Sequence, residues 1–241
     1  MSTEILLISD LHLSPEHPAT VERFLRFTRE RARQAGELYI LGDLFDAWIG
    51  DDNDSAPYPE IRTAMQALSQ SGTNVYLQHG NRDFLLGERF CSQTGSRLIG
   101  DETVCDFFGT PTLLMHGDTL CTDDFAYQQA RQLLRNEQFI ADFLNKPLQE
   151  RALIAAEYRK KSGEATSLLA ADIMDVNTRA VMEMMRKHGV CRLVHGHTHR
   201  QAIHQLEIDG SRCERIVLGE WHSDHGMALS ITANGITEVT V

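Results

Sequence analysis

The sequence of 241 residues has no long apolar run, no cationic leader and no excess of basic residues. No segment approaches the roughly 18 consecutive apolar residues of a transmembrane helix. The opening stretch, MSTEILLISD, lacks the positive charges that begin a signal peptide, so we expect a cytoplasmic protein. The formal net charge of −11 disfavours nucleic acid as a partner, because phosphate backbones bind basic surfaces.

Cysteine pairs with metal-binding or redox spacing are also absent. The five cysteines are an odd number, and no two of them follow the C-x-x-C pattern. We therefore expect reduced thiols and no zinc knuckle. Internal repeats and low-complexity segments are missing as well. Together with a hydrophobic fraction of 42%, this predicts a single globular domain over residues 1–241.

Short apolar runs with the length of buried strands recur along the chain. The predicted strands are 4–8, 38–41, 74–77, 112–115 and 191–194. The stretches 20–36 and 61–72 are helix-like, and each ends at a glycine. This alternation predicts an α/β fold with parallel strands. Near the end of the chain, turn signals at Asp209-Gly210 and Asn234-Gly235 predict two hairpins.

A long helix-like segment at 122–188 interrupts the rhythm of the strands. We predict from it a helical cap, inserted into the domain at about 122–176. Four apolar residues of the cap share one helical face: Phe139, Ile140, Phe143 and Leu144. Such a face either lines a groove for an apolar ligand or packs as the core of the cap itself.

Each predicted strand is followed directly by aspartate, asparagine or histidine. The strand ends read SDLH at 9–12, GD at 42–43, HGNRD at 79–83, HGD at 116–118 and HGHTH at 195–199. The carboxyl ends of parallel strands form the binding crevice of α/β sheets. Imidazole, carboxylate and amide ligands suit manganese, iron, nickel or zinc. The ligands are too many for one ion, and two ions about 3.5–4 Å apart that share a carboxylate would serve displacement at phosphorus.

These motifs, in this order, resemble the calcineurin-like metallophosphoesterase superfamily. The longer stretches YILGDLFDAWIGDD, HGNRDFLLG, MHGDTLCTDD and HGHTHR resemble the UDP-2,3-diacylglucosamine pyrophosphatases of lipid A biosynthesis. The resemblance implies a core of mixed β-sheets flanked by helices, with a helical cap insertion. It also implies metal-dependent hydrolysis of the substrate's pyrophosphate, which yields UMP and 2,3-diacylglucosamine 1-phosphate.

The resemblance further assigns seven catalytic metal ligands for two divalent ions, expected to be Mn²⁺. One ion would be held by Asp10, His12 and His199, the other by Asn81, His116 and His197, and both by Asp43. His197 and His199 would then serve different ions. Gly196 would let the backbone turn sharply between the strand and these ligands.

The same resemblance assigns the substrate contacts. They are Asn81, Arg82, Asp124, Tyr127, Ser162, Thr166, His195 and His197. For His195 a hydrogen-bonded role in supporting the loop is the alternative. Thr166 and Leu169 stand where family members commonly have asparagine and lysine, and Leu169 cannot donate a hydrogen bond.

Arg82 stands where many superfamily members have a histidine placed to protonate the leaving oxygen. Arginine stays charged near neutral pH and cannot act as a general acid. A phosphate monoester leaving group, with a second pKa of about 6, needs no proton. Arg82 therefore favours an anhydride substrate over an alkyl ester, and would clamp a phosphate. The alternative is a salt bridge to Asp83 or another acid.

For partners, the resemblance implies a lipid-linked nucleotide and peripheral association with the cytoplasmic face of the inner membrane. The RKKS stretch at 159–162 would meet phosphates or a membrane surface, or else form a solvated helix face. The oligomeric state cannot be predicted. Two other functions remain open: a dinuclear-metal pyrophosphatase or phosphodiesterase for another nucleotide diphosphate, and a non-catalytic binding scaffold, although none of the seven ligands is missing.

Overall fold

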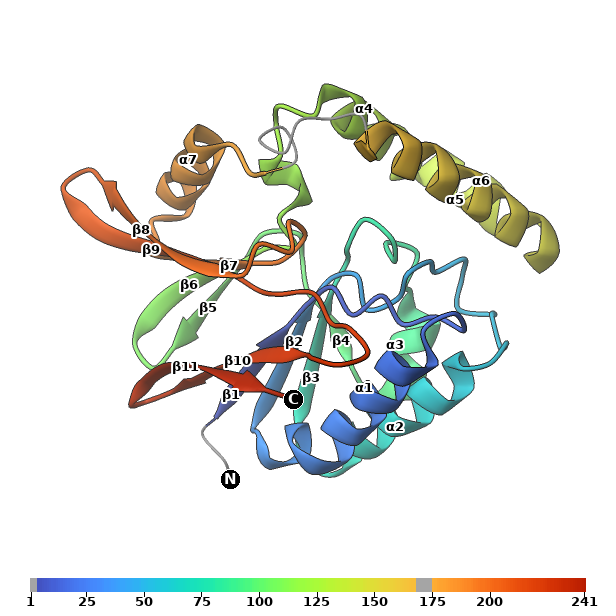
Figure 1. The fold of residues 1–241 in the computed structure, drawn as a ribbon, viewed down its shortest axis with the longest axis horizontal. Coiled ribbons are helices and arrows are strands. Elements are labelled where there is room, and N and C mark those ends of the chain that lie inside the picture. Colours follow the sequence, from blue (N-terminus) through green and yellow to red (C-terminus); the bar gives the residue numbers. More distant parts are fainter. Residues whose placement is uncertain (1–3, 168–174) are drawn as a thin grey trace.

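Two mixed β-sheets lie between layers of helices in the computed structural model (Figure 1). The structure describes residues 4–167 and 175–241, and for residues 161–167 it describes the backbone alone. The first sheet has parallel strands in its centre and on one side, and antiparallel strands on the other. In spatial order it contains β11 (Gly235–Thr240), β10 (Met227–Thr232), β1 (Ile5–Ile8), β2 (Glu37–Leu41), β3 (Asn74–Gln78) and β4 (Arg97–Leu98).

The second sheet is also mixed. Its central strands are parallel, and an antiparallel strand lies at each edge. In spatial order it contains β5 (Thr103–Phe107), β6 (Thr110–Leu114), β7 (Arg192–His195), β9 (Ser211–Val217) and β8 (Ala202–Ile208). The mixed sheets flanked by helices that the resemblance implied are thereby confirmed.

Helices cover the outer face of each sheet. The first sheet is covered by α1 (Pro18–Glu30), α2 (Tyr58–Gln70) and α3 (Glu88–Thr94), and the second by α7 (Thr178–His188). The expected helix over 20–36 is shorter than predicted, because the chain tightens into a 3₁₀ turn at Ala32–Gln34 before it reaches Gly36. The helix expected over 61–72 begins earlier, at Tyr58, where Pro59 fits the first turn.

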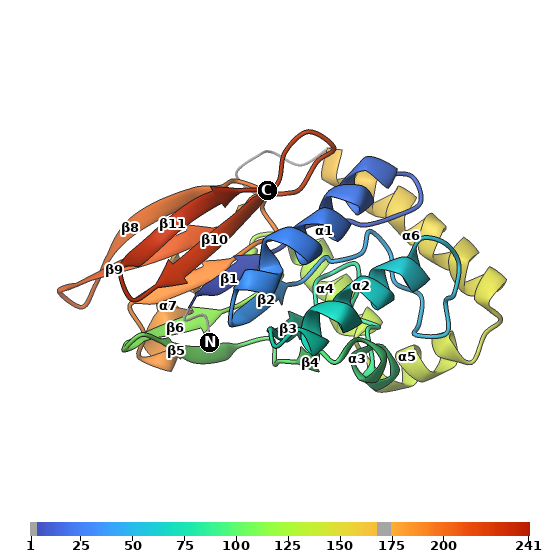
Figure 2. The same cartoon turned by 90° about the horizontal axis from the view of Figure 1, so that it is seen from below.

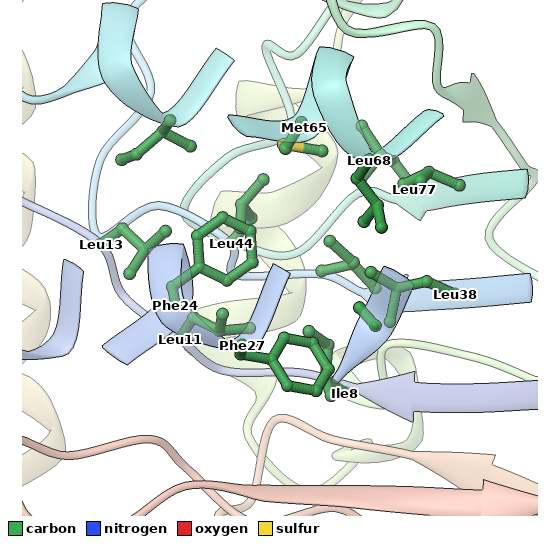
Figure 3. Close-up of a cluster of buried hydrophobic side chains, with 14 of the residues drawn as sticks. Ile8, Leu11, Leu13, Phe24, Phe27, Leu38, Leu44, Met65, Leu68 and Leu77 are labelled. Carbon is green, nitrogen blue, oxygen red and sulfur yellow. The ribbon is translucent and has the colours of Figure 1, made fainter. Parts of the chain in front are cut away.

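The main core fills the space between the first sheet and its helices. Figure 3 shows Ile8 and Leu38 from the strands packed with Phe24 and Phe27 of α1. Phe24 is fully buried, so truncation to alanine would cost about 3–5 kcal/mol. Along β1 the side chains alternate, and Leu7 therefore points into a second core between the two sheets.

Both sheets contain elements that the apolar runs did not reveal. β4 has only two residues, and β5, which reads TVCDF, is not a continuous apolar run. A tight turn at Phe108 and Gly109, both with positive φ, joins β5 to β6. The predicted hairpin at Asp209-Gly210 is confirmed as the two-residue turn between β8 and β9. The hairpin predicted at Asn234-Gly235 is confirmed between β10 and β11.

The segment between β6 and β7 forms three further helices that project beyond the sheets (Figures 1 and 2). These are α4 (Phe125–Leu134), α5 (Glu137–Leu144) and α6 (Leu148–Ser167). Ser162 and Thr166 lie on α6, but their side chains are outside the described set, and Leu169 lies outside the described residues. No described helix is both long enough and apolar enough to span a bilayer.

Candidate metal centre

The seven predicted ligands all lie just beyond the carboxyl ends of central strands. Asp10 and His12 follow β1, Asp43 follows β2, Asn81 follows β3, His116 follows β6, and His197 and His199 follow β7. The strands β1, β2 and β3 run parallel in one sheet, and β6 and β7 run parallel in the other. The ends of the strands therefore bring all seven side chains together in one place.

The first group of ligands consists of Asp10, His12 and His199. The Nε2 atoms of the two histidines lie 3.4 Å apart, and His199 Nε2 lies 3.4 Å from Asp10 Oδ1. The other oxygen, Asp10 Oδ2, accepts hydrogen bonds from the Ser9 hydroxyl at 2.6 Å and the His197 backbone N–H at 2.9 Å. Asp10 Oδ1 is thereby left facing the imidazoles.

The second group consists of Asn81, His116 and His197. His116 Nε2 and His197 Nδ1 each lie 3.0 Å from Asn81 Oδ1. On its other side, His116 Nδ1–H donates to the Leu41 carbonyl at 2.8 Å. This bond orients the ring and makes Nε2 the nitrogen that would bind an ion, the arrangement that a metal ligand requires.

Asp43 lies between the two groups. Its Oδ2 is 3.9 Å from His12 Nδ1, and its Oδ1 is 3.8 Å from His116 Nε2. The Arg82 backbone N–H holds Oδ1 with a hydrogen bond of 2.9 Å. The carboxylate is thus placed within reach of ions held by either group.

The donor atoms fit divalent cations. Within the described part of the chain, buried Asp10 Oδ1 and His12 Nδ1 have no hydrogen-bond partner. In each of two sets of residues, the ligand atoms lie within 4.8 Å of one another. One set is Asp10, His12 and His199, and the other is Asp10, Asp43 and His116. Buried polar atoms without partners are costly, by about 1–3 kcal/mol each, and a cation would satisfy them.

Five of the seven ligands have left-handed backbone. The residues with positive φ include Asp10, His12, Asp43, His197 and His199, with φ between 49° and 66°. This conformation is uncommon outside glycine and persists only where the surrounding structure enforces it. The clustering at one site indicates that the loops are built to direct side chains inward.

Glycines beside the ligands allow close approach of the backbone. A Cβ on Gly80 would overlap the Asp43 carboxylate, and a Cβ on Gly196 would overlap that of Asp10. Gly196 was expected to permit a sharp turn, but its φ is not among the positive values, and it is His197 and His199, which follow it, that take the left-handed conformation. Its role is therefore to make room for Asp10.

Burial and charge set the protonation of the ligands. Burial raises the pKa of Asp43 to about 7, and lowers the pKa of His12 to about 3 and that of His197 to about 4. Burial also lowers the pKa of His199, but the Asp10 and Glu220 carboxylates outweigh it and raise that pKa to about 10. His12 and His197 are therefore kept neutral, as metal ligands must be, whereas His199 is protonated beside two carboxylates.

Asp83 is a buried carboxylate that supports the loops of the centre. It is fully buried and accepts hydrogen bonds from the backbone N–H groups of Gly80 at 2.8 Å, Leu44 at 2.7 Å and Asp43 at 3.3 Å. It thereby joins the loops after β2 and β3. Arg82 pairs with a different acid, since its Nη1 lies 3.3 Å from Asp46 Oδ1.

The predicted substrate contacts with described side chains line one side of the centre or support it. The Tyr127 ring lies 5.9 Å from that of His197, and its hydroxyl donates to Asp118 at 2.6 Å. Asp124 caps the N-terminus of α4, where it accepts a bond from the Tyr127 N–H at 2.9 Å. His195 exposes no surface, and its Nδ1–H donates to the Gly196 carbonyl at 2.8 Å. This geometry suits the supporting role for His195.

Glu220 was not anticipated from the sequence, although it lies against the first group of ligands. Its Oε2 is 2.9 Å from His199 Nδ1. A signal was present, because RIVLGE places a glycine and an acid shortly after a strand, as LGD does after the second predicted strand.

A comparison with protein families agrees with this geometry. A family described as calcineurin-like phosphoesterase matches residues 3–201. The chain belongs to this family. The resemblance seen in the strand-end motifs is thus confirmed. This chain is accordingly an enzyme rather than a non-catalytic binding scaffold.

Curated relatives of this phosphoesterase are similar over nearly the full length. It is 50% identical to the UDP-2,3-diacylglucosamine hydrolase of Pseudomonas paraeruginosa, over 96% of both chains. The proteins of the same name from Salmonella typhi and Serratia proteamaculans are 48% and 46% identical, again over 96% of both chains. The closer resemblance, to the enzymes that act on UDP-2,3-diacylglucosamine, is confirmed as well.

Proposed function

We propose that this phosphoesterase hydrolyses the pyrophosphate bond of UDP-2,3-diacylglucosamine to UMP and 2,3-diacylglucosamine 1-phosphate, a step of lipid A biosynthesis. The observation that carries the proposal is the convergence of six predicted ligands around the seventh, Asp43, in a chain that is 50% identical to a UDP-2,3-diacylglucosamine hydrolase.

Two divalent ions, expected to be Mn²⁺, would occupy the centre. Asp10, His12 and His199 would hold one, Asn81, His116 and His197 the other, and Asp43 both. When bound, such ions lower the pKa of water and neutralise charge on phosphoryl oxygens. The chain's own contribution is to hold the donors rigidly, through the left-handed loops and the bonds to Asp83 and Leu41.

Arg82 would clamp a phosphate of the substrate. Its side chain is 36% exposed and shares the Asp46 carboxylate with Arg159 of α6. The Arg82 guanidinium is therefore only partly paired by this carboxylate. An anionic pyrophosphate would bind it through charge-assisted hydrogen bonds. Arg159 is thus an ion-pair partner of Asp46 rather than part of a purely solvated face.

The remaining substrate contacts stay as predicted from the resemblance. Asn81 and His197 would meet the substrate beside the ions, and Tyr127 and Asp124 would meet it from α4. Ser162 and Thr166 would bind the sugar. His195 would act indirectly, because it has no exposed surface.

The cap at about 122–176 would select the lipid. Three apolar side chains of α4 and α6 are largely exposed: Phe125 at 74%, Leu133 at 58% and Leu153 at 73%. Phe143 of the expected groove face is only 8% exposed, because it packs within the cap beside Phe139. The exposed residues, rather than Phe143, are therefore the ones available to acyl chains.

Peripheral binding to the cytoplasmic face of the inner membrane would bring the enzyme to its substrate. A diacylated substrate resides in lipid, and the exposed apolar residues of the cap would enter the bilayer interface. Vesicle flotation, with and without the substrate, tests this association.

The decisive experiment compares substrates at equal concentration with the manganese-loaded protein. We expect UMP from UDP-2,3-diacylglucosamine, with kcat/KM at least about 100-fold above UDP-sugars, because burying acyl chains adds several kcal/mol. Reaction in ¹⁸O water should label UMP, the sign of attack on the nucleotide phosphorus. Equal rates on UDP-sugars would favour the alternative, a pyrophosphatase for another nucleotide diphosphate.

A further inference from the structure

Glu220 contacts the first group of ligands from outside. Its Oε2 accepts a hydrogen bond from His199 Nδ1 at 2.9 Å, and its Oε1 lies 3.9 Å from His12 Nε2. A third imidazole, that of His222, has its Nε2 3.5 Å from the same Oε2. The Glu220 side chain is 28% exposed, and its shortest contact among these is the one to His199.

The main chain around Glu220 is fixed on both sides. Before it, the Leu218 N–H donates to the His195 carbonyl at 2.7 Å, and after it, the Trp221 N–H donates to the Asp10 carbonyl at 3.0 Å. The Trp221 indole is buried in the main core. Glu220 is therefore tied to both segments that supply the first group, and its carboxylate is held in place by the same framework.

We propose that Glu220 is a positioning residue for His199. By accepting the Nδ1–H, the carboxylate directs Nε2 toward Asp10 Oδ1 at 3.4 Å and makes Nε2 the nitrogen that would give up its proton to an ion. A carboxylate behind a ligating histidine fixes the ring and its tautomer, and makes the imidazole a stronger donor. The proposal rests on the two-metal site proposed above and adds a residue outside its seven ligands.

Manganese binding without substrate tests the proposal. Free Mn²⁺ is measured by electron paramagnetic resonance during titration of metal-free wild type, Glu220→Ala and Glu220→Gln. We expect Glu220→Ala to weaken one of the two ions about 10- to 100-fold, the usual effect of losing such a partner. Glu220→Gln should weaken it less, because the amide oxygen still accepts the Nδ1–H.

Asp224→Asn is the matched control. Asp224 is 83% exposed in the same loop and pairs with His225, so this change removes the same charge without touching His199. It should bind manganese as wild type does, and circular dichroism of each metal-free protein checks the fold. Unchanged affinity in Glu220→Ala would overturn the proposal, as would a Glu220→Gln variant as weak as Glu220→Ala. A wild type that binds no manganese would instead overturn the two-metal site itself.

Discussion

The metal centre and the neighbouring cap differ in how deeply their residues are buried. In the centre, Asp10, Asp43 and His116 are at most 3% exposed. In the cap, α4 buries no residue and α5 buries only Phe143. The centre is set by strands packed between two cores, and its loops are joined by backbone hydrogen bonds. The cap has little core of its own and leaves large apolar side chains in solvent.

Arginines attach the cap to the rest of the molecule. Arg131 pairs with Asp118 at 2.7 Å, and Arg135 donates to the Gly80 carbonyl at 2.9 Å. On α6, Arg151 donates to Asp52 and Arg159 to Asp46. Leu153 lies two residues from Arg151, on the opposite side of the helix. The cap thus turns its charges to the core and some of its apolar surface outward, so damage to it should leave the metals in place.

The largest effect is expected in the metal centre, from a substitution of Asp43. Asp43→Asn should lower kcat/KM at least about 1,000-fold, the equivalent of about 4 kcal/mol, because both ions lose a charged ligand. Metal analysis should give about two manganese ions per wild-type chain and fewer in the variant. Glu238→Gln, an exposed acid on β11, is the control. One ion per wild-type chain at full activity would contradict the bridging role.

Arg82 lies on the boundary between the two regions. Arg82→His should lower kcat/KM for the pyrophosphate substrate about 10- to 100-fold, since a charge-assisted contact of about 1.5–3 kcal/mol is lost. It should also raise cleavage of a UMP alkyl ester relative to the anhydride, because histidine can protonate an alkoxide. Arg89→His, 54% exposed beside Asp54, is the control. An unchanged ratio of ester to anhydride cleavage would refute the leaving-group argument.

A smaller effect is expected from charge on the cap. Leu153→Asp should lower kcat/KM for the acylated substrate about 10-fold or more, the equivalent of losing a Leu contact of about 1.5 kcal/mol, while a soluble UDP-linked analogue is turned over as before. Gln149→Asp adds the same charge at another exposed position of α6. Equal losses on both substrates, in a folded and metal-loaded variant, would show that Leu153 has no part in lipid selection.

The smallest effect concerns the attachment of the cap. Arg151 is 3% exposed and donates to the Ile49 carbonyl at 2.5 Å and to Asp52. Arg151→Ala should lower the free energy of local unfolding of α6 by about 1 kcal/mol, a modest amount because its partner Asp52 is half exposed. Thermolysin should therefore cleave the cap about 5-fold faster. Manganese affinity should not change. Lys146→Ala, which removes an exposed pair with Glu150, should have no comparable effect. Loss of manganese in Arg151→Ala would show that the cap and the centre are not independent.

The sequence predicted the metal centre better than the cap, for a physical reason. Buried parallel strands are continuous apolar runs, and topology forces their ends to meet, so local patterns sufficed to place the candidate ligands in one region. The family resemblance then assigned seven of them to two ions. The pairing of Arg159 with Asp46 joins distant positions and depends on how α6 docks. No local pattern encodes that docking.

Two misses have the same origin. β5 reads TVCDF, and its polar residues hide a strand at the edge of a sheet, where one face meets solvent. Glu220 follows a strand whose first half is polar and which therefore does not read as a buried apolar run. The apolar face that contains Phe143 is a different case, because its spacing left open whether a ligand or the protein itself covers it. In the structure Phe143 is buried, whereas Leu144 of the same face is 39% exposed.

The left-handed backbone at five ligands also governs how the metal preference of this centre can change. Aspartate, asparagine and histidine accept positive φ more readily than other residues apart from glycine. At positions 12, 197 and 199, exchange among these three types would keep the loop and alter the donor atom, whereas Asp10 and Asp43 are packed closely by Gly196 and Gly80. A β-branched residue at any of the five positions would force the loop to rebuild. The donor set of the candidate centre would therefore change most easily at its left-handed histidines, without disturbing the sheets that support it.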